Sequence, residues 1–524
     1  MVRPIFTILV ALCACVLTIA WFWPPALWAF LVLAPLIALA IWDVHQTKHA
    51  VLRNFPIIGH FRYLFEMIRP EIMQYFIETN TDGQPFSREQ RSVVYQRAKK
   101  QIDTLPFGTQ RDVYEVGYEW IHHSIAPTHP RDFNPRITVG KTQCAQPYEL
   151  SIFNVSAMSF GSLSANAVLA LNEGARLAGF AHNTGEGGVS PYHLEPGGDL
   201  IWQLGTGYFG ARSDDGGFDR GKFREVSQIS NIKMIEIKLS QGAKPGHGGI
   251  LPGRKVTPEI ARIRGVRVGM DVLSPPGHSA FGSPLELVHF IAELRELSGG
   301  KPIGIKLCVG KRRQFAAICK AMLETGITPD YVAVDGGEGG TGAAPLEFSN
   351  SIGMPLNEGL VFVHNTLVGS NLRDRVKIGA SGKIVTGFSL LSKLALGADF
   401  GYSARGMMFA IGCIQALRCN TNDCPTGVAT QRPELMRGLV PGDKAHRVAH
   451  FHQATLHAFT EILAAAGVER HEDLRPWHIH RRISETESRH LAQVYNYIEP
   501  GSLLESPLPI GFARVWTEAD YASW

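Results

Sequence analysis

Charge is missing from the first part of the chain. No Asp, Glu, Lys or Arg lies between Arg3 and Asp43. Over the whole chain neither sign dominates, because 51 basic and 47 acidic residues leave a net charge of +4. This balance, without a basic stretch interleaved with aromatic residues, excludes nucleic-acid binding as the expected function. A charged fraction of 19% beside 45% apolar residues also excludes wholesale disorder.

Several motifs are missing as well. The eight cysteines are scattered and do not have the spacing of a secreted disulfide framework. No Walker motif occurs, and no Gly-x-Gly-x-x-Gly run opens an expected helix, which excludes P-loop nucleotide binding and a Rossmann site for NADPH. No internal repeat stands out. The 524 residues are enough for one large domain and an accessory region.

The uncharged start of the chain consists of two apolar segments, Ile5–Trp23 and Ala26–Trp42, separated by Pro24-Pro25. Each is close to the roughly 20 helical residues that cross a bilayer core. Tryptophans lie near the segment ends and basic residues flank the outer ends. We therefore predict a transmembrane helical hairpin that anchors the protein in a membrane, with the catalytic domain facing the cytoplasm. A cleaved signal peptide and a buried soluble hairpin are the alternatives.

From Glu149 onward, short apolar runs alternate with segments of helical periodicity. This alternation is typical of parallel α/β proteins. Gly, Ser, Lys or Asp follows most strands, as in a barrel whose site lies at the carboxyl ends of its strands. We predict an α/β fold, a (β/α)₈ TIM barrel, and an open doubly wound sheet is the alternative. The expected strands are Leu150–Val155, Ile235–Leu239, Val268–Leu273, Ile303–Cys308, Tyr331–Val334, Val376–Ile378 and Phe400–Tyr402. The expected helices are Asn166–Leu177, Leu285–Leu297, Gln314–Thr325 and Leu390–Leu396.

These patterns divide the chain into four parts. Residues 1–45 form the hairpin and residues 46–147 a small accessory region with helical spacing at Ile68–Glu78 and Arg88–Ile102. Residues 148–435 form the barrel, and residues 436–524 a C-terminal helical extension.

Three cysteines crowd into one short segment. Cys413, Cys419 and Cys424 have the spacing Cys-x₅-Cys-x₄-Cys, and Pro425 follows the last of them. Thiolates suit iron–sulfur clusters and zinc. Structural zinc usually takes four ligands, whereas three thiolates match a [3Fe–4S] cluster, and a Cys-Pro ending is typical of ferredoxin-type runs. Ordinary buried cysteines are the alternative interpretation.

Glycine-rich segments follow three expected strands in succession: Asp335–Gly342, Ala380–Gly382 and Ser403–Gly406. Barrel enzymes often bind a phosphate with the backbone of such loops, and Arg405 supplies a positive charge there. A single glycine cluster usually marks only a turn. Three clusters in register at successive strand ends favour a phosphate site.

Lysines mark two further strand ends. Lys306 lies inside an apolar strand, where it needs either an anionic ligand such as a reduced flavin or a buried salt bridge. The loop Lys238–Gly249 carries Lys238, Gln241 and Lys244, which suit the carboxylates of a small acid. A solvated basic loop is the alternative.

Taken together, these residues resemble the FMN-binding synthase domain of glutamate synthase, and more closely the stand-alone FMN-binding glutamate synthase family proteins. The likeness spans roughly residues 149–432. The cysteine spacing followed by Cys424–Gln431 carries it, together with Ser156–Ser164, Asn183–Gly188, Lys238–Gly249, Leu273–Pro276 and Asp335–Pro345.

The resemblance implies a barrel that holds FMN and a [3Fe–4S] cluster close enough to exchange electrons. In that family 2-oxoglutarate and ammonia form 2-iminoglutarate, which reduced FMN converts to L-glutamate. Cys413, Cys419 and Cys424 correspond to the cluster ligands. The catalytic and substrate-binding positions correspond to Glu186, Lys238, Gln241 and Lys244. The FMN-binding positions correspond to Met158, Ser159, Lys306, Gly339, Gly340, Gly382, Ala404, Arg405 and Gly406.

The sequence departs from the family pattern at several places. His247 stands where glutamate synthases usually have glutamate, and Ile250 where they usually have glutamine. The glutaminase domain with its N-terminal cysteine is not present in this sequence. We therefore expect a small 2-oxoacid and free ammonia or an amine as substrates, and ferredoxin, a reductase subunit or the membrane as the source of electrons. The alternatives are a membrane-anchored FMN/iron–sulfur oxidoreductase that acts on another small substrate with a membrane electron carrier, and a non-enzymatic scaffold.

Overall fold

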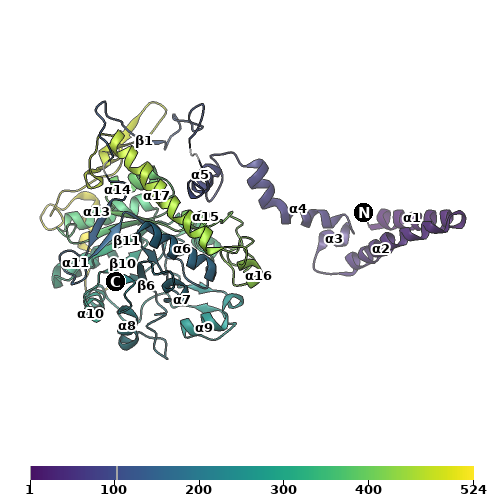
Figure 1. Ribbon diagram of the computed structural model, residues 1–524, viewed down its shortest axis with the longest axis horizontal. Coiled ribbons are helices and arrows are strands. Elements are labelled where there is room, and N and C mark those ends of the chain that lie inside the picture. Colours follow the sequence, from purple (N-terminus) through teal and green to yellow (C-terminus); the bar gives the residue numbers. More distant parts are fainter. Residues whose placement is uncertain (1, 102–103, 131) are drawn as a thin grey trace. The chain divides into compact units, whose positions relative to one another are not determined.

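The computed structural model describes residues 2–101, 104–130 and 132–524. The chain forms two compact units, one ending at Arg88 and the other running from Glu89 to Trp524. Figure 1 shows both, with the first unit in purple at the start of the colour scale.

The first unit is helical. It contains α1 (Val2–Phe22), η1 (Pro24–Ala29), α2 (Phe30–His45), α3 (Ala50–Asn54), α4 (Gly59–Ile72) and η2 (Met73–Ile77). The spans Val2–Phe22 and Pro24–His45 are long and apolar enough to cross a membrane, by length and composition. The chain turns between them at the two prolines, so the predicted pair of apolar helices is confirmed.

Most apolar side chains of this helix pair point outward. A small cluster around Ile5, Leu9 and Ala40 is buried between α1 and α2, and Leu33 is the other buried apolar residue among the described residues of these helices. Trp21, with 85% of its surface exposed, and Leu31, with 67%, are typical of the remainder. Exposed apolar surface of this extent is uncommon in soluble monomers.

Eight parallel strands of the second unit close into a barrel in the order β10-β11-β12-β13-β4-β5-β6-β7. They are β4 (Phe153–Val155), β5 (His182–Asn183), β6 (Leu200–Leu204), β7 (Ile232–Lys238), β10 (Ile303–Leu307), β11 (Tyr331–Asp335), β12 (Lys377–Ser381) and β13 (Phe400–Ser403). Every residue of β6 and β10 is buried, because side chains fill the barrel and helices cover it (Figure 1). The predicted (β/α)₈ barrel is confirmed.

Helices follow the strands around the barrel. They are α6 (Ala165–Ala178), α7 (Pro191–Leu194), α8 (Arg220–Ser227), α9 (Pro258–Arg264), α10 (Pro284–Leu297), α11 (Arg312–Thr325), α12 (Leu346–Ser351), α13 (Leu356–Gly369), α14 (Gly387–Ala395) and α15 (Arg405–Ala410). Local sequence fixes their ends. In α6, the Ser164 hydroxyl accepts a hydrogen bond from the Ala167 N–H at 3.1 Å, and Gly179 ends the helix in the left-handed conformation.

The strand predictions were right for six of the seven segments, which overlap barrel strands. The prediction of a strand at Val268–Leu273 was wrong except for β9 (Val272–Leu273), which pairs with β8 (Ile250–Leu251) in an antiparallel ribbon outside the barrel. Two barrel strands, β5 and β6, were missed. β5 has only two residues, and β6 is a five-residue, mostly apolar run, too short for a periodicity by which a strand can be recognised.

The remaining elements flank the barrel. They are α5 (Arg88–Ala98), β1 (Glu119–Ile121), β2 (Arg136–Val139), β3 (Tyr148–Ser151), η3 (Gly253–Lys255), α16 (Pro433–Met436), α17 (Pro441–Ala465), η4 (His471–Asp473), η5 (Pro476–His478), β14 (Ile479–Arg482), β15 (Ser488–His490), α18 (Leu491–Val494) and α19 (Ile510–Thr517). β14 pairs with β1 and with β15, so the segment 436–524 contains strands as well as the long helix α17. The second helix predicted in the accessory region corresponds to α5, and its predicted end, Ile102, lies outside the described residues.

The contact between α6 and α17 gives a test of this packing. A Cβ atom added at Gly174 would lie 2.6 Å from Cβ of Val448 and 2.7 Å from the Ala445 carbonyl. We expect Gly174→Ala to destabilise the second unit by about 1–3 kcal/mol through overpacking. The control is Gly442→Ala in α17, where a Cβ has no neighbour within 4 Å and the substitution should not lower the stability. Thermal unfolding followed by circular dichroism measures both, and equal melting temperatures for the two variants would contradict the packing.

Candidate functional site

A buried ion pair joins the ends of two barrel strands, β5 and β7, that flank β6. Lys238 is the last residue of β7, and Glu186 follows β5. The Lys238 Nζ lies 2.8 Å from Glu186 Oε1, and the two side chains are 7% and 18% exposed. The carboxyl ends of parallel strands in a barrel meet on one face, which is where barrel enzymes place their chemistry.

Two further cations act on the same carboxylate. Burial lowers the pKa of Lys244 to about 8 against the raising effect of Glu186, and it lowers the pKa of Arg264 to about 10, again opposed by Glu186. Burial alone would raise the pKa of Glu186, but Lys238, Lys244 and Arg264 bring it below its ordinary value. Three buried cations thus face one carboxylate, an excess of two positive charges.

Arg264 is held from one side only. Its Nη2 donates to the Phe160 carbonyl at 2.9 Å and to Ser159 Oγ at 3.3 Å, and its guanidinium lies over the Phe209 ring at 5.2 Å. Its Nε–H is buried and has no acceptor among the described residues. A buried donor without a partner is costly, so this N–H indicates a place for an acceptor from outside the chain.

A small cavity opens at this point. It has a volume of about 30 Å³ and is lined by Ser159, Ser162, Glu186, Phe209, Gly249, Ile250, Leu251, Arg264, Val272 and Ser274. Of the two positions at which the sequence departs from the family it resembles, Ile250 borders the cavity. His247 instead has its ring against Phe348, with centroids 5.4 Å apart.

His278 forms hydrogen bonds at the carboxyl end of β7. One ring nitrogen of His278 lies 2.9 Å from the Lys238 carbonyl and the other 3.0 Å from the Tyr208 hydroxyl. Burial lowers the pKa of His278 to about 4, which keeps the ring neutral at physiological pH. His278 therefore fixes the backbone of Lys238 and adds no charge to the site.

Lys306 forms the salt bridge that the sequence left as one of two possibilities. Its Nζ lies 3.5 Å from Asp335 Oδ2, and the two side chains are 7% and 13% exposed. The Gly242 N–H also donates to Asp335 Oδ2, at 2.8 Å. The loops after β7 and β11 are thereby joined beside Lys306.

The glycine-rich loops leave the Arg405 guanidinium accessible. Gly340 lies beside the guanidinium, since a Cβ atom built on it would be 3.6 Å from Arg405 Nη2. Arg405 begins α15, and its Nη1 donates to Met408 Sδ at 3.2 Å. No carboxylate of the described residues forms an ion pair with it. A loop that approaches an unpaired guanidinium with glycine alone suits an anionic group such as a phosphate.

The three cysteines lie on one loop after α15. Cys413 and Cys424 are buried and Cys419 is partly exposed. Burial raises the pKa of the Cys413 thiol to about 11, and Arg405 opposes this. Among the described residues, no three His, Cys, Asp or Glu side chains converge as ligands of a single metal ion. In an iron–sulfur cluster each thiolate binds a different iron, so such convergence is not required.

A buried lysine links the cysteine loop to the rest of the site. Lys255 is 2% exposed, and its Nζ donates to the Ala429 carbonyl at 2.8 Å and to the Ser162 carbonyl at 3.1 Å. Ser162 lies in the loop after β4 that also carries Ser159. The charge of Lys255 acts on Cys419 and Cys424.

Comparison with known proteins shows the family of the chain. Residues 87–469 match the family model described as the conserved region in glutamate synthase. The chain belongs to the glutamate synthase family of oxidoreductases.

Three curated relatives illustrate the range of this glutamate synthase family. The chain is 38% identical to the glutamate synthase large subunit-like protein YerD of Bacillus subtilis (strain 168) over 469 residues, which cover 82% of this chain and 89% of YerD. It is 37% identical to the archaeal glutamate synthase [NADPH] of Methanocaldococcus jannaschii, with coverage of 61% and 60%. It is 35% identical to the glutamate synthase [NADPH] large chain of B. subtilis, of which it covers 20%.

The structure brings several of the candidate residues of this glutamate synthase family member together. Glu186, Lys238 and Lys244 form one charged group, and Ser159 touches it through Arg264. Gly340 and Arg405 lie close to each other. Gln241 joins by its backbone, since its carbonyl accepts from the Lys244 N–H at 3.3 Å.

Sequence reasoning missed four residues of the site: Tyr208, Lys255, Arg264 and His278. Arg264 shows why. It lies in α9 two positions after Arg262, and the two arginines differ only in their exposure, since Arg264 is buried and Arg262 is exposed. The helix N-cap at Thr257 and the ending at Gly265 could have fixed the helix, but not which of its arginines faces inward.

The charge balance around Glu186 predicts a stability effect. Glu186→Gln would leave Lys238, Lys244 and Arg264 without their carboxylate, and breaking such a buried pair costs about 3–5 kcal/mol. Because the folded state lowers the pKa of Glu186, its stabilisation is complete above the unfolded pKa and is lost as the pH falls through the folded pKa. We expect the variant to melt well below the wild type at neutral pH, with a smaller difference in acid.

The matched control is Glu225→Gln, which removes an exposed carboxylate in α8. Thermal melting at several pH values measures both variants. A Glu186→Gln melting curve that coincides with that of the control at neutral pH would contradict the role of the carboxylate.

Proposed function

We propose that the chain reductively aminates a small 2-oxoacid, 2-oxoglutarate in the first place, with free ammonia or an amine. The observation that carries this proposal is the excess of two positive charges around Glu186, formed by Lys238, Lys244 and Arg264. A dicarboxylate would balance that excess, and its oxygens would accept from the unpaired Arg264 Nε–H. The relatives named as glutamate synthases support the same chemistry.

We propose FMN as the cofactor, which when bound in its reduced form supplies the hydride. Arg405 and the loops of Gly339, Gly340, Gly382, Ala404 and Gly406 would hold its phosphate, because Gly340 lies beside the guanidinium. Met158, Ser159 and Lys306 would line the ring. Lys306 already has a carboxylate partner in Asp335 at 3.5 Å, so it would orient the ring by hydrogen bonding without an unbalanced charge.

Within this site the residues have distinct tasks. Lys244 and Arg264 would bind carboxylates of the substrate, and Gln241 would orient it. Lys238 would hold the 2-oxo oxygen, with its backbone fixed by His278. Glu186 accepts a hydrogen bond from Lys238 and is ionised, so it would orient the attacking ammonia by accepting its N–H.

We propose a [3Fe–4S] cluster on Cys413, Cys419 and Cys424. Support comes from the three thiols on one loop and from two nearby cations, the buried Lys255 and the partly exposed Arg405, since positive charge stabilises thiolate-bound iron. The donor of electrons would be ferredoxin, a reductase subunit or a membrane carrier.

We also propose that α1 and α2 anchor the chain in a membrane, with the barrel in the cytoplasm. Their outward-facing apolar side chains support this, because burying such surface in lipid is favourable. The basic residues Arg3, Lys48 and Arg53 at the outer ends favour a cytoplasmic location of both ends.

The substrate assay tests the function directly. Anaerobically purified protein is reduced with dithionite, and 2-oxoglutarate with ammonium is added. We expect the flavin absorbance to return, with a substrate affinity that falls as the pH rises through about 8, because Lys244 then loses its proton. Lys244→Gln should weaken 2-oxoglutarate binding about tenfold or more at pH 7 and remove this pH dependence.

Lys233→Gln is the control for Lys244→Gln, since Lys233 lies at the end of β7 opposite to Lys238 and is 38% exposed.

Ile250 favours a second candidate substrate, a 2-oxoacid with an apolar side chain, because Ile250 borders the cavity. The same assay with 2-oxoisovalerate decides between the two. If no 2-oxoacid restores the flavin absorbance with ammonium, the proposed amination is wrong.

Lys255 provides a separate test of the cluster. Its buried charge would stabilise the reduced, more negative form, so Lys255→Met should lower the reduction potential on the order of tens of millivolts. A redox titration followed by electron paramagnetic resonance measures this. Lys222→Met, on the exposed face of α8, is the control. An unchanged potential in Lys255→Met with an intact signal would contradict the placement of the cluster.

A further inference from the structure

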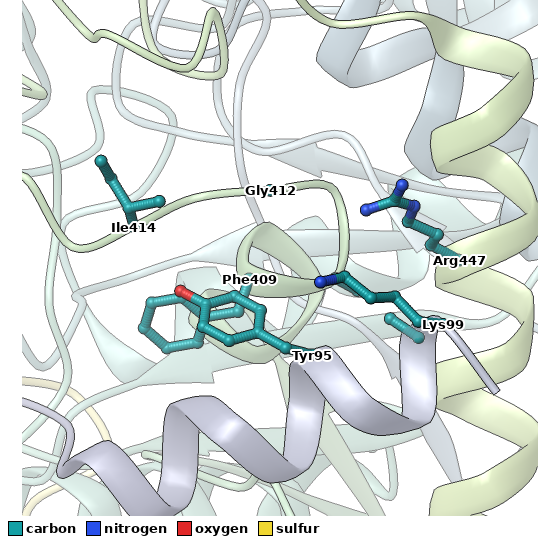
Figure 2. A pocket seen from close by; sticks show the side chains of 8 residues that line it. Tyr95, Lys99, Phe409, Gly412, Ile414 and Arg447 are labelled. Carbon is teal, nitrogen blue, oxygen red and sulfur yellow. The ribbon is translucent and has the colours of Figure 1, made fainter. Parts of the chain in front are cut away.

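A second, larger pocket lies on the outer side of the cysteine loop. It has a volume of about 220 Å³ and is lined by Tyr95, Ala98, Lys99, Phe409, Ala410, Gly412, Ile414 and Arg447. Figure 2 shows the rings of Tyr95 and Phe409 beside one another, with Lys99 and Arg447 on one side and Ile414 on the other. The proposed amination uses none of these residues.

The wall of this pocket is the backbone that carries a cluster cysteine. Gly412 and Ile414 line it, and Cys413 stands between them. The Tyr95 hydroxyl donates to the Cys413 carbonyl at 2.6 Å. A molecule in the pocket is therefore separated from Cys413 by little more than the loop itself.

The lining combines apolar surface with two cations. Ala98, Phe409 and Ala410 are buried and form an apolar wall. The Arg447 Nη2 lies 3.0 Å from Asp443 Oδ2, while the exposed Lys99 side chain has no ion-pair partner among the described residues. Sites for small molecules are typically apolar with a few polar groups that fix orientation.

The volume and the lining of this pocket favour one class of ligand. An apolar cavity of about 150 Å³ binds benzene, so 220 Å³ holds a substituted ring system. A free phosphate would leave the apolar wall uncovered, and an acyl chain would leave the cations unused. A quinone fits both features, because its flat ring packs on Phe409 and its carbonyl oxygens accept from Lys99 and Arg447.

We propose that this pocket binds the head group of a membrane quinone, which exchanges electrons with the cluster through the Cys413 loop. The proposal rests on the proposed function for the cluster and names its electron partner. The two apolar helices of the chain bring it to the membrane in which such quinones dissolve.

The reaction balances without any other redox partner. In the direction of amination, the 2-oxoacid and ammonia lose water and form the imine. The quinol gives up two electrons and two protons and becomes the quinone. The imine takes up two electrons and two protons and becomes the amino acid, so one quinol is oxidised for each amino acid formed. The reverse sequence oxidises the amino acid and reduces the quinone.

The test is binding of menadione to the detergent-purified holoprotein, measured by isothermal titration calorimetry. We expect saturable binding to the wild type. Ala98→Phe places a ring in the pocket and should abolish binding, and Lys99→Gln should weaken it about tenfold by removing a charged donor. Lys100→Gln, which changes the adjacent exposed lysine outside the pocket, is the matched control and should bind as the wild type does.

Because Ala98 is 2% exposed, a failure of Ala98→Phe to fold is checked by circular dichroism, and the exposed Lys99→Gln then decides. Absence of saturable binding to the wild type, or equal binding by Lys99→Gln and Lys100→Gln, would overturn the proposal. Flavin reoxidation by 2-oxoglutarate and ammonium after dithionite reduction should persist in Ala98→Phe. That arm separates a failure of the pocket from a failure of the amination.

Discussion

The site depends on one buried carboxylate. Glu186 stands between Lys238, Lys244 and Arg264, and no arrangement of three cations at the mouth of a barrel is stable without an anion among them. Its ion pair with Lys238 joins the ends of β5 and β7 across β6. The same carboxylate leaves two positive charges in excess, so the site is folded and yet still attracts an anionic ligand.

A second constraint is how closely the loops of this face approach one another. A Cβ atom at Gly185 would lie 2.6 Å from the Ser159 N, so the loops after β4 and β5 touch at backbone level. Lys255 then ties the β4 loop to the cysteine loop through the Ser162 and Ala429 carbonyls. The charged group around Glu186 and the three cysteines are thus parts of one connected face of the barrel.

The sequence was sufficient for the barrel and for the residues at the ends of its recognisable strands. Lys238 and Lys306 could be located because a charge that ends or interrupts an apolar strand is visible in the pattern. Arg264 and His278 could not, because they lie on a helix and a loop outside the alternation, and only folding brings them against Glu186 and Lys238. Pairing of Lys306 with Asp335 likewise depends on the register of β10 and β11.

The cysteine loop between α15 and α17 has different neighbours on its two sides. On one side Lys255 and Arg405 act on the sulfurs. On the other side α5 covers the loop, with Tyr95 bonded to the Cys413 carbonyl, and α17 contributes Arg447. A buried redox centre needs a route to its partner as well as to its substrate. The proposed cluster would face the β4 loop on its inner side and the pocket lined by Tyr95 on its outer side, so the segment that would hold it is also one that a partner could reach.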